Sequence, residues 1–533
     1  MIRFRHIVPA LLSAALGAAA PAVLSSCSDD WDNHYETQDA ISDSNVDEMI
    51  AADPELTTFA KMLQISGYDK LLASSQTFTV FAPENSALTD VDLNDVEAVR
   101  RVVANHIARF NCSTATSPTQ GVKMLNGKRF FFEAGSFGGA QFDAADLLAQ
   151  NGILHKMKGQ IPYVYNLREY IDTHSNTSDL SAFLSRFDTE KLDVEASVAI
   201  GVDSEGRTVY DSVLVSYNPI FDDAIYGLGA IANEDSTFTM LVPDNAAYQA
   251  AYERIRPYFN AWNADQAVAD SLADVQTSLA IVSDLVYRAR ITDPFAWGVQ
   301  ESTSGSEFES LADMFAGTTR IDGSNGIIYL APVLNYDNTL TFQKEIEIEG
   351  EEQTGRTIST QTTINVRTVD SSNPFADQIS EMKYLEVLPR TTSAQPMVTF
   401  SIPDVLSGAY DIYVSFVPEN VLNASAATKP SRLKFTLRYM DTDGKTKSKS
   451  YSAKTLVTNA SEMTLMKVAE GFEFPVANFT DRLWLADETH SANDVTTTTT
   501  LQIQTNVTAQ EANRGTYVRR FNVDRIILVP VKK

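Results

Sequence analysis

Two short acidic segments hold the residues best suited to metal or acid–base chemistry. The segment Asp441-Thr442-Asp443-Gly444 has the alternating carboxylates and the glycine with which a calcium-binding loop begins. The third acidic ligand and the distant glutamate of such a loop are missing, and strand-like runs flank the segment, so a hairpin turn is favoured. The stretch 345–352 is rich in glutamate, and a carboxylate pair could in principle serve glycoside hydrolysis. Its glutamates alternate with Ile346 and Ile348, which favours the solvated face of a strand.

Histidine and cysteine are scarce, with 6 and 2 residues in the chain. The sequence contains no paired-cysteine or His-Glu-x-x-His metal motif, no Gly-x-Ser-x-Gly and no phosphate-binding glycine loop. We therefore predict no metal, no cofactor and no catalytic residue. Cys112 has no motif around it, which is typical of a half-buried structural thiol.

His106 belongs to an apolar stripe, together with Val99, Val103 and Ile107, whose spacing predicts a helix. On such a stripe a buried, hydrogen-bonded imidazole is favoured, and contact with a ligand is the alternative. A second stripe, from Leu272 to Val286, predicts another helix.

Aromatic residues in the last third of the chain are the candidates for sugar stacking. Carbohydrate sites place flat aromatic faces beside polar groups. Trp484, which lies in a loop-like segment, is the first candidate, and Tyr410 and Tyr413 are the others. The aromatic residues of a β-sandwich more often belong to its core, so both interpretations stay open.

One twelve-residue segment occurs twice, at 77–88 and at 237–248, and the copies are identical at six positions. Its first half is aromatic and β-branched, which predicts a buried strand. Pro83 and Pro243 would end the two strands, and an asparagine two residues later is suited to begin a helix. The offset of 160 residues is too long for a solenoid repeat and indicates a duplicated domain.

This segment resembles the first signature of fasciclin-like (FAS1) domains. Their second signature is similar to Asn151-Gly152-Ile153-Leu154-His155 and, more weakly, to the run that starts at Asn325-Gly326. The Tyr-His pair of the family is half kept in each copy, as His106 and as Tyr287. The resemblance covers about residues 45–335, and it implies cell adhesion or matrix binding.

From about residue 338, period-2 alternation replaces the helical stripes, as in Leu433, Phe435 and Leu437. Many short strands with polar turns predict an antiparallel sandwich. The last run, 522–528, resembles the final strand of galactose-binding-like jelly rolls. The predicted fold class is therefore multidomain: two α+β fasciclin-like domains, at 45–165 and 166–337, followed by an all-β, jelly-roll-like sandwich at 338–533.

The N-terminus has the pattern of an export signal. Arg3 and Arg5 precede a proline-broken apolar run that ends in Leu24-Ser25-Ser26-Cys27, which resembles a bacterial lipobox. We predict a signal peptide at 1–26, a lipid anchor on Cys27 and an acidic tether at 27–44. The segment 28–32 resembles the export signal of Bacteroidetes surface lipoproteins, so the expected location is the outer membrane, facing the exterior.

The net charge of −27 disfavours nucleic acid as a partner. The leading hypothesis is a non-enzymatic cell-surface lipoprotein for adhesion or for binding extracellular protein or matrix. The alternative is a glycan-binding accessory lipoprotein of a polysaccharide-uptake system, in which the sandwich reads sugar. An enzyme with a site assembled across domains is the third hypothesis.

Overall fold

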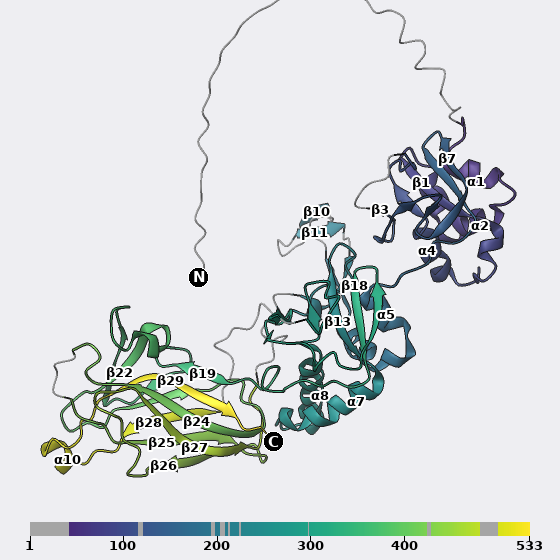
Figure 1. Ribbon diagram of the computed structural model, residues 1–533. Coiled ribbons are helices and arrows are strands. Elements are labelled where there is room, and N and C mark those ends of the chain that lie inside the picture. The colour runs from purple at the N-terminus through teal and green to yellow at the C-terminus, as the bar shows by residue number, and fades with distance from the viewer. Residues whose placement is uncertain are drawn as a thin grey trace, which may run out of the picture. The chain divides into compact units, whose positions relative to one another are not determined.

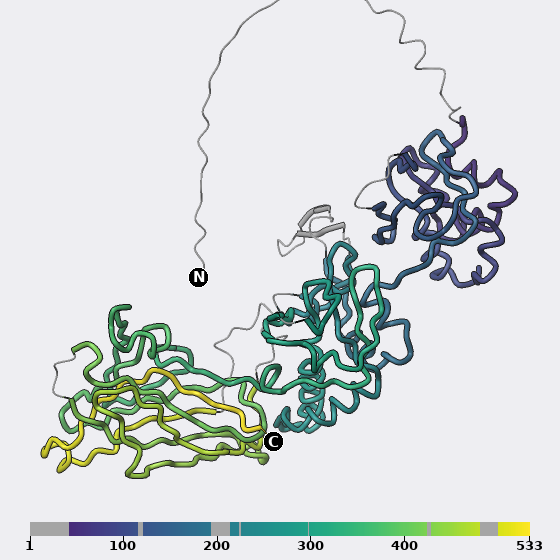
Figure 2. Tube along the Cα trace, in the orientation of Figure 1, coloured from purple at the N-terminus to yellow at the C-terminus, as the bar shows by residue number. Residues whose placement is uncertain are grey.

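The computed structural model describes residues 42–115, 121–192, 198–202, 208–211, 214–222, 225–296, 298–423, 428–479 and 499–532. The chain divides into two compact units, Met1–Tyr163 and Val164–Lys533, and each is described by itself. Figure 1 shows the helices and strands of both units, and Figure 2 shows the course of the main chain. No helix among the described residues has both the length and the apolar character needed to cross a membrane.

The first unit packs helices against a sheet with the strand order β2-β1-β8-β7-β6-β5. The central strand, β1 (Phe78–Pro83), is buried along its whole length and pairs in parallel with β8 (Gly152–Met157). The other strands are β2 (Ile107–Arg109), β5 (Phe132–Glu133), β6 (Ser136–Phe137) and β7 (Ala140–Ala149), and a separate pair is β3 (Val122–Lys123) with β4 (Arg129–Phe130). The helices are α1 (Val46–Ala52), α2 (Thr57–Ser66), α3 (Tyr68–Leu72) and α4 (Val96–Ala104). Apolar residues of the helices and of β1 form one core.

The second unit begins with the same arrangement. Its sheet has the order β14-β13-β18-β17, and β13 (Phe238–Pro243) pairs in parallel with β18 (Gly326–Ala331). Phe238 lies opposite Gly326, just as Phe78 lies opposite Gly152. The partners are β14 (Val286–Tyr287), β17 (Thr319–Gly323), α5 (Leu167–Thr173), α6 (Ser178–Ser185), α7 (Asn245–Ile255) and α8 (Gln266–Val282). Additional strand pairs are β9 (Thr189–Leu192) with β12 (Leu214–Tyr217), β10 (Val198–Val202) with β11 (Thr208–Asp211), and β15 (Gln300–Glu301) with β16 (Glu307–Phe308).

The asparagines of the two Asn-Gly turns hold equivalent hydrogen bonds. In the first copy, Asn151 accepts from the amide of Val46 and donates to the carbonyls of Leu72 (2.6 Å) and Ser74 (3.0 Å). In the second, Asn325 accepts from the amide of Leu167 and donates to two carbonyls, those of Ile231 (2.8 Å) and Asn233 (3.1 Å). Each side chain thereby ties the hairpin turn to the start of the first helix and to the loop before the central strand. The repeated sequence thus encodes a repeated tertiary arrangement.

Both predicted helices are shorter than their apolar stripes. Helix α4 ends at Ala104, and α8 ends at Val282. The carbonyl of His106 instead accepts from the amide of Phe81 (2.9 Å), and that of Leu285 accepts from Leu241 (2.9 Å). The prediction was wrong about these last residues because the buried residues of a short strand that follows a helix after two or three intervening residues can continue the apolar spacing of the helix. His106 is therefore equivalent to Leu285. Tyr287, opposite Thr239, is equivalent to Ala108, opposite Thr79, so it does not stand where the tyrosine of the Tyr-His pair was expected.

The rest of the second unit is a sandwich of two sheets. One has the order β21-β22-β29-β24-β27, with β19 also paired to β29, and the other has the order β20-β23-β28-β25-β26. All of these pairs are antiparallel, as the alternation predicts. The strands are β19 (Ile346–Glu349), β20 (Thr357–Ile358), β21 (Thr362–Thr368), β22 (Lys383–Pro389), β23 (Met397–Ser401), β24 (Gly408–Val417), β25 (Leu433–Met440), β26 (Thr446–Tyr451), β27 (Thr464–Phe474), β28 (Thr500–Thr505) and β29 (Phe521–Pro530). Both sheets contribute to one apolar core.

The sandwich packs directly on the preceding part of the second unit. The amide of Ser407 donates to the carbonyl of Tyr258 (2.8 Å), and the amide of Ala477 donates to that of Asn260 (2.8 Å). Leu406 belongs to the core of the α+β part. Gly444 lies so close to Trp262 that a β-carbon added to the glycine would be 2.1 Å from the indole. These contacts explain why residues 164–533 form one unit.

Candidate functional site

Two of the candidate residues, Cys27 and Trp484, lie outside the described residues. The lipid anchor and the leading candidate for sugar stacking therefore stay predictions. The remaining candidates, His106, Tyr410 and Tyr413, are described.

His106 lies directly after helix α4 and is fully buried. Its Nδ1 is 2.8 Å from the carbonyl of Val102 and must donate, while its Nε2 accepts from the amide of Ile161 at 2.9 Å. Burial lowers the pKa of this imidazole to about 4, so the ring is neutral at pH 7. Both nitrogens bond to the main chain, so the ring links α4 to the end of the domain.

His155 has an equivalent role on β8. Its Nε2 is 2.9 Å from the carbonyl of Cys112, and its Nδ1 accepts from the amide of Asp146 at 3.2 Å. Burial lowers the pKa of His155. The ring stacks on Phe81 at a centroid distance of 4.9 Å, and Phe137 covers the other face of Phe81 at 3.8 Å. His155 is therefore part of a stacked aromatic cluster in the core of the domain, which indicates a structural role.

Tyr410 and Tyr413 lie on opposite faces of β24. Tyr410 is only 1% exposed and belongs to the sandwich core, and burial raises the pKa of its phenol to about 12. Its ring is therefore not accessible for stacking on a sugar. Tyr413 is half-buried; its hydroxyl donates to Asp411 at 3.3 Å, and the ammonium of Lys467 lies 5.3 Å from the centre of its ring. Lys467 also donates to Asp411 (2.8 Å), so these three residues form a fixed polar and aromatic cluster.

The acidic segments take the structures that the alternation predicts. Asp441–Gly444 is the turn between β25 and β26, where the amide of Gly444 donates to the carbonyl of Asp441. Both carboxylates of the turn are within 4 Å of lysines, Asp441 of Lys447 and Asp443 of Lys445 and Lys447. The glutamate-rich stretch includes β19, which pairs with β29. The turn carboxylates therefore already have cationic partners from the same hairpin.

A three-carboxylate cluster that the sequence did not predict lies in the first unit. Glu55, Glu84 and Asp143 place carboxylate oxygens within 4.8 Å of one another. The ammonium of Lys156 forms an ion pair with Glu55 and is 3.9 Å from Asp143. This lysine supplies the positive charge that the cluster requires. No local sequence pattern predicts the cluster, because the four residues come from separate segments of the chain.

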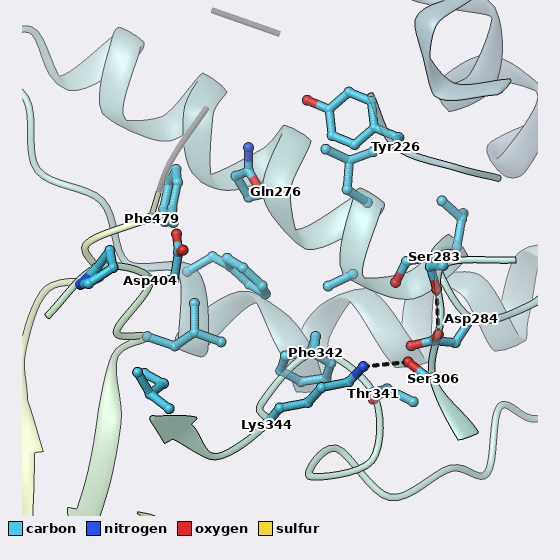
Figure 3. A pocket seen from close by; sticks show the side chains of 18 of the residues that line it. Tyr226, Gln276, Ser283, Asp284, Ser306, Thr341, Phe342, Lys344, Asp404 and Phe479 are labelled. Atoms are coloured by element: carbon cyan, nitrogen blue, oxygen red, sulfur yellow. Dashed lines mark hydrogen bonds between the residues drawn. The ribbon is translucent and has the colours of Figure 1, made fainter. Parts of the chain in front are cut away.

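A cavity of about 520 Å³ opens in the second unit, between its α+β part and the sandwich. Most of the lining belongs to helix α8 with the two residues after it, to the stretch 341–348 and to the loop between β23 and β24. The rest comes from residues within 220–228, from Phe259, Ser304 and Ser306, and from Phe479. Phe259, Phe342 and Leu406 form part of an apolar wall. Figure 3 shows the polar groups of Ser283, Asp284, Ser306 and Lys344 at one end and Asp404 with Phe479 at the other.

The polar end of this cavity is organised around Asp284, which is 4% exposed. One carboxylate oxygen accepts from the hydroxyls of Ser302 (2.7 Å) and Ser304 (2.6 Å). Lys344 donates to the hydroxyl of Ser306 at 2.7 Å. At the other end, Asp404 has a φ of 57°, a left-handed conformation that aspartate tolerates better than most residues. Sequence reasoning missed the cavity because its lining comes from segments more than a hundred residues apart.

The comparisons with known proteins assign the first domain. Residues 54–159 match the family model described as "Fasciclin domain". This part of the chain is therefore a fasciclin domain, as the two signatures predict. No curated protein gives a significant match to the chain.

Several solved structures are similar to parts of the chain. A FAS1 domain pair from the insect cell adhesion molecule Fasciclin I is 15% identical, with a TM-score of 0.19, and the match covers 54% of this chain and 98% of that one. The CBM22 tandem of Paenibacillus barcinonensis Xyn10C is 15% identical (TM-score 0.21), and the match covers 35% of this chain and 45% of that one. A family 35 carbohydrate-binding module from Clostridium thermocellum is 12% identical (TM-score 0.16), covering 34% and 97%. With TM-scores below 0.5, these likenesses establish no shared function.

Proposed function

We propose that this protein is a non-enzymatic, lipid-anchored cell-surface protein that binds an extracellular protein or matrix partner through fasciclin domains. The observation that carries the proposal is the fasciclin domain at 54–159. The domain around β13 and β18 is, in this proposal, a second copy. Its support is the shared register of the parallel strands and the shared hydrogen bonding of Asn151 and Asn325.

The two histidines of the first domain support a binding role over an acid–base role. His106 and His155 are fully buried, and each ring is hydrogen-bonded to the main chain through both nitrogens. Burial lowers the pKa of both rings. A general base must reach the proton that it removes, and these nitrogens are already committed.

The surface of the first domain offers large apolar side chains to a partner. Phe110 is 75% exposed and has a φ of 69°, and Phe131 is 53% exposed. A bulky residue in the left-handed region is strained, and such strain is common at functional sites. Exposed aromatic residues are also typical of interface hot spots. We assign these two phenylalanines to the partner surface.

Vesicles that carry the acylated full chain test the proposal. They should bind immobilised collagen, fibronectin or mucin, or aggregate with one another, more than vesicles without protein do. The double variant Phe110→Ser, Phe131→Ser should lose most of this binding, while Phe295→Ser, which changes a phenylalanine of the second unit with 56% exposure, should keep it. Equal binding by the double variant and by the unchanged chain would refute the assigned surface. No binding to any of these surfaces would refute the adhesive role.

The cluster of Tyr413, Asp411 and Lys467 favours a second candidate function, the reading of glycans by the sandwich. An aromatic ring beside fixed charged groups is the composition of many sugar sites. A glycan array probed with the full chain should then give signals that Tyr413→Ala weakens and that Trp484→Ala removes. A blank array, with binding to protein surfaces retained, would leave adhesion as the only function of the two.

A further inference from the structure

One face of the sandwich is a regular polar surface. It is the outer face of the sheet β20-β23-β28-β25-β26, whose strands β28, β25 and β26 lie side by side in Figure 1. Phe435 and Leu437 of β25 belong to the sandwich core. Because side chains alternate along a strand, Lys434, Thr436 and Arg438 of the same strand point outward. We call the outward side chains of β23, β28, β25 and β26 the polar sheet face.

Cross-strand pairing arranges the polar sheet face in rows. Thr436 lies opposite Gln502 of β28 and opposite Ser450 of β26. In the next row, Lys434 lies opposite Gln504. Neighbouring strands are about 4.8 Å apart, so a row offers a hydrogen-bonding side chain at about that interval. None of the five strands of this sheet contains an acidic residue, although the chain has 69.

The two cations of the polar sheet face have no acidic partner. Lys434 and Arg438 are four residues apart on β25, which corresponds to about 13 Å along the strand. Within the part of the chain that the structure describes, the side chain of neither residue forms an ion pair or a hydrogen bond. By contrast, Arg432, just before the same strand, is paired with Glu511. The positive charge of this face is therefore available to an external group.

The composition of this face matches a sugar chain that carries carboxylates. Threonine, serine and glutamine side chains both donate and accept hydrogen bonds, as sugar hydroxyls do. Lysine and arginine pair with carboxylates, and a guanidinium can hold both oxygens of one carboxylate. Arg438 is exposed, and Lys434 is half-buried. Two separated cations among neutral hydrogen-bonding groups therefore suit a polymer with many hydroxyls and occasional carboxylates.

Other polyanions fit this face less well. Nucleic acids carry a phosphate at every nucleotide, and their single strands are bound by stacking on aromatic rings. A membrane surface is bound by clusters of basic residues or by apolar side chains that enter the bilayer. None of the outward side chains of the four strands is aromatic, and only Lys434 and Arg438 are basic.

We propose that the polar sheet face binds an acidic polysaccharide, a chain of sugars of which some carry a carboxylate. The carboxylates pair with Lys434 and Arg438, and the sugar hydroxyls bond to the rows of neutral side chains. The site is independent of the fasciclin domains, and it lies on the other sheet from the cluster around Tyr413. The negative charge of the whole chain does not prevent this binding, because at physiological salt exposed charges are screened beyond about 8 Å.

Calorimetric titration of the full chain with three carboxylated polysaccharides tests the proposal: polygalacturonate, alginate and hyaluronate. At least one of them should bind, and its carboxyl-reduced form, in which each carboxylate is an alcohol, should bind at least ten times more weakly. Poly-glutamate, which has carboxylates but no sugar, should bind no better than the reduced form. No binding of any of the three, or equal binding of the reduced form or of poly-glutamate, would overturn the proposal.

Variants locate the binding. The double variant Lys434→Gln, Arg438→Gln should weaken it at least tenfold. Lys447→Gln, Lys449→Gln is the matched control: it removes the same charge from the same hairpin, but these lysines lie opposite core-side residues of β25, on the other side of the sheet. This control and Tyr413→Ala should keep the affinity within about twofold. Equal losses in the two double variants, or loss of binding in Tyr413→Ala, would overturn the assignment to the polar sheet face.

Discussion

Replacing Gly152 by alanine tests how the parallel strands of the first unit are held together. Gly152 is the first residue of β8 and lies opposite Phe78 of β1. A β-carbon at this position would lie 1.9 Å from the carbonyl oxygen of Phe78. Because that oxygen belongs to the main chain, no side-chain rotation can relieve the clash, and the two strands must move apart.

The cost follows from overpacking and from lost hydrogen bonds. Forcing extra atoms into a packed core costs about 1–3 kcal/mol. Weakening the first bonds of the β1–β8 ladder adds about 1 kcal/mol for each bond lost. We therefore expect Gly152→Ala to lower the free energy of unfolding of the first unit by about 3–5 kcal/mol. For a domain of this size, this corresponds to a fall in Tm of roughly 10–20 °C.

Differential scanning calorimetry of the full chain measures this fall, because the two units are separately compact. Gly159→Ala is the control, because a β-carbon at this position would meet nothing within 4 Å. Its free energy of unfolding should stay within about 1 kcal/mol of that of the unchanged chain. Gly326→Ala should repeat the loss in the second unit, since its β-carbon would also be 1.9 Å from a carbonyl, that of Phe238. Identical thermograms for Gly152→Ala and Gly159→Ala would refute the account of the strand contact.

Three further predictions concern other parts of the chain. As pH falls from about 6.5 to about 4, the free energy of unfolding of the first unit should fall by about 3 kcal/mol through His106. The reason is that burial lowers the pKa of the folded ring to about 4, while the ring of the unfolded chain takes up a proton near pH 6.5. Above pH 7 both rings are neutral and this stability does not change with pH, and urea titrations should show a flatter pH profile for His106→Asn. In cells that are fed an alkyne-bearing fatty acid, the protein should become labelled with the fatty acid, and the variant Cys27→Ser should not. Equal labelling of the variant and of the unchanged chain would rule out this anchor. In chemical unfolding, Gly444→Ala should lower the stability of the second unit more than Gly471→Ala does. Both glycines have a positive φ, but only at Gly444 would the added β-carbon meet the indole of Trp262. Equal losses of stability would show that the indole moves aside.

Local sequence patterns were sufficient to predict the strands of the repeated segment. The aromatic and β-branched runs that end at Pro83 and Pro243 became β1 and β13, each ending at its proline. The Asn-Gly pairs became hairpin turns in which the asparagine also accepts a hydrogen bond from the first helix of its domain. These features depend on backbone preferences within a few residues, which a sequence shows directly.

Features that depend on distant segments could not be predicted in this way. The apolar spacing around His106 was consistent with a continued helix, and only its pairing with Phe81 of β1 shows where the helix ends. Tyr410 and Tyr413 looked alike in the sequence, and their odd spacing puts them on opposite faces of β24. Packing of the second sheet decides which face is buried, and Tyr410 lies on that face. The cavity near Asp284 depends on packing between the sandwich and the α+β part, which no local pattern encodes.

Attachment of whole cells tests the central claim most directly. Cells of a bacterial host that makes the full chain should attach to immobilised matrix protein, and attachment should fall to the background of the host with either Cys27→Ser or the double variant Phe110→Ser, Phe131→Ser. Attachment that is unchanged by both variants, or no attachment with the chain present on the cell surface, would contradict the account.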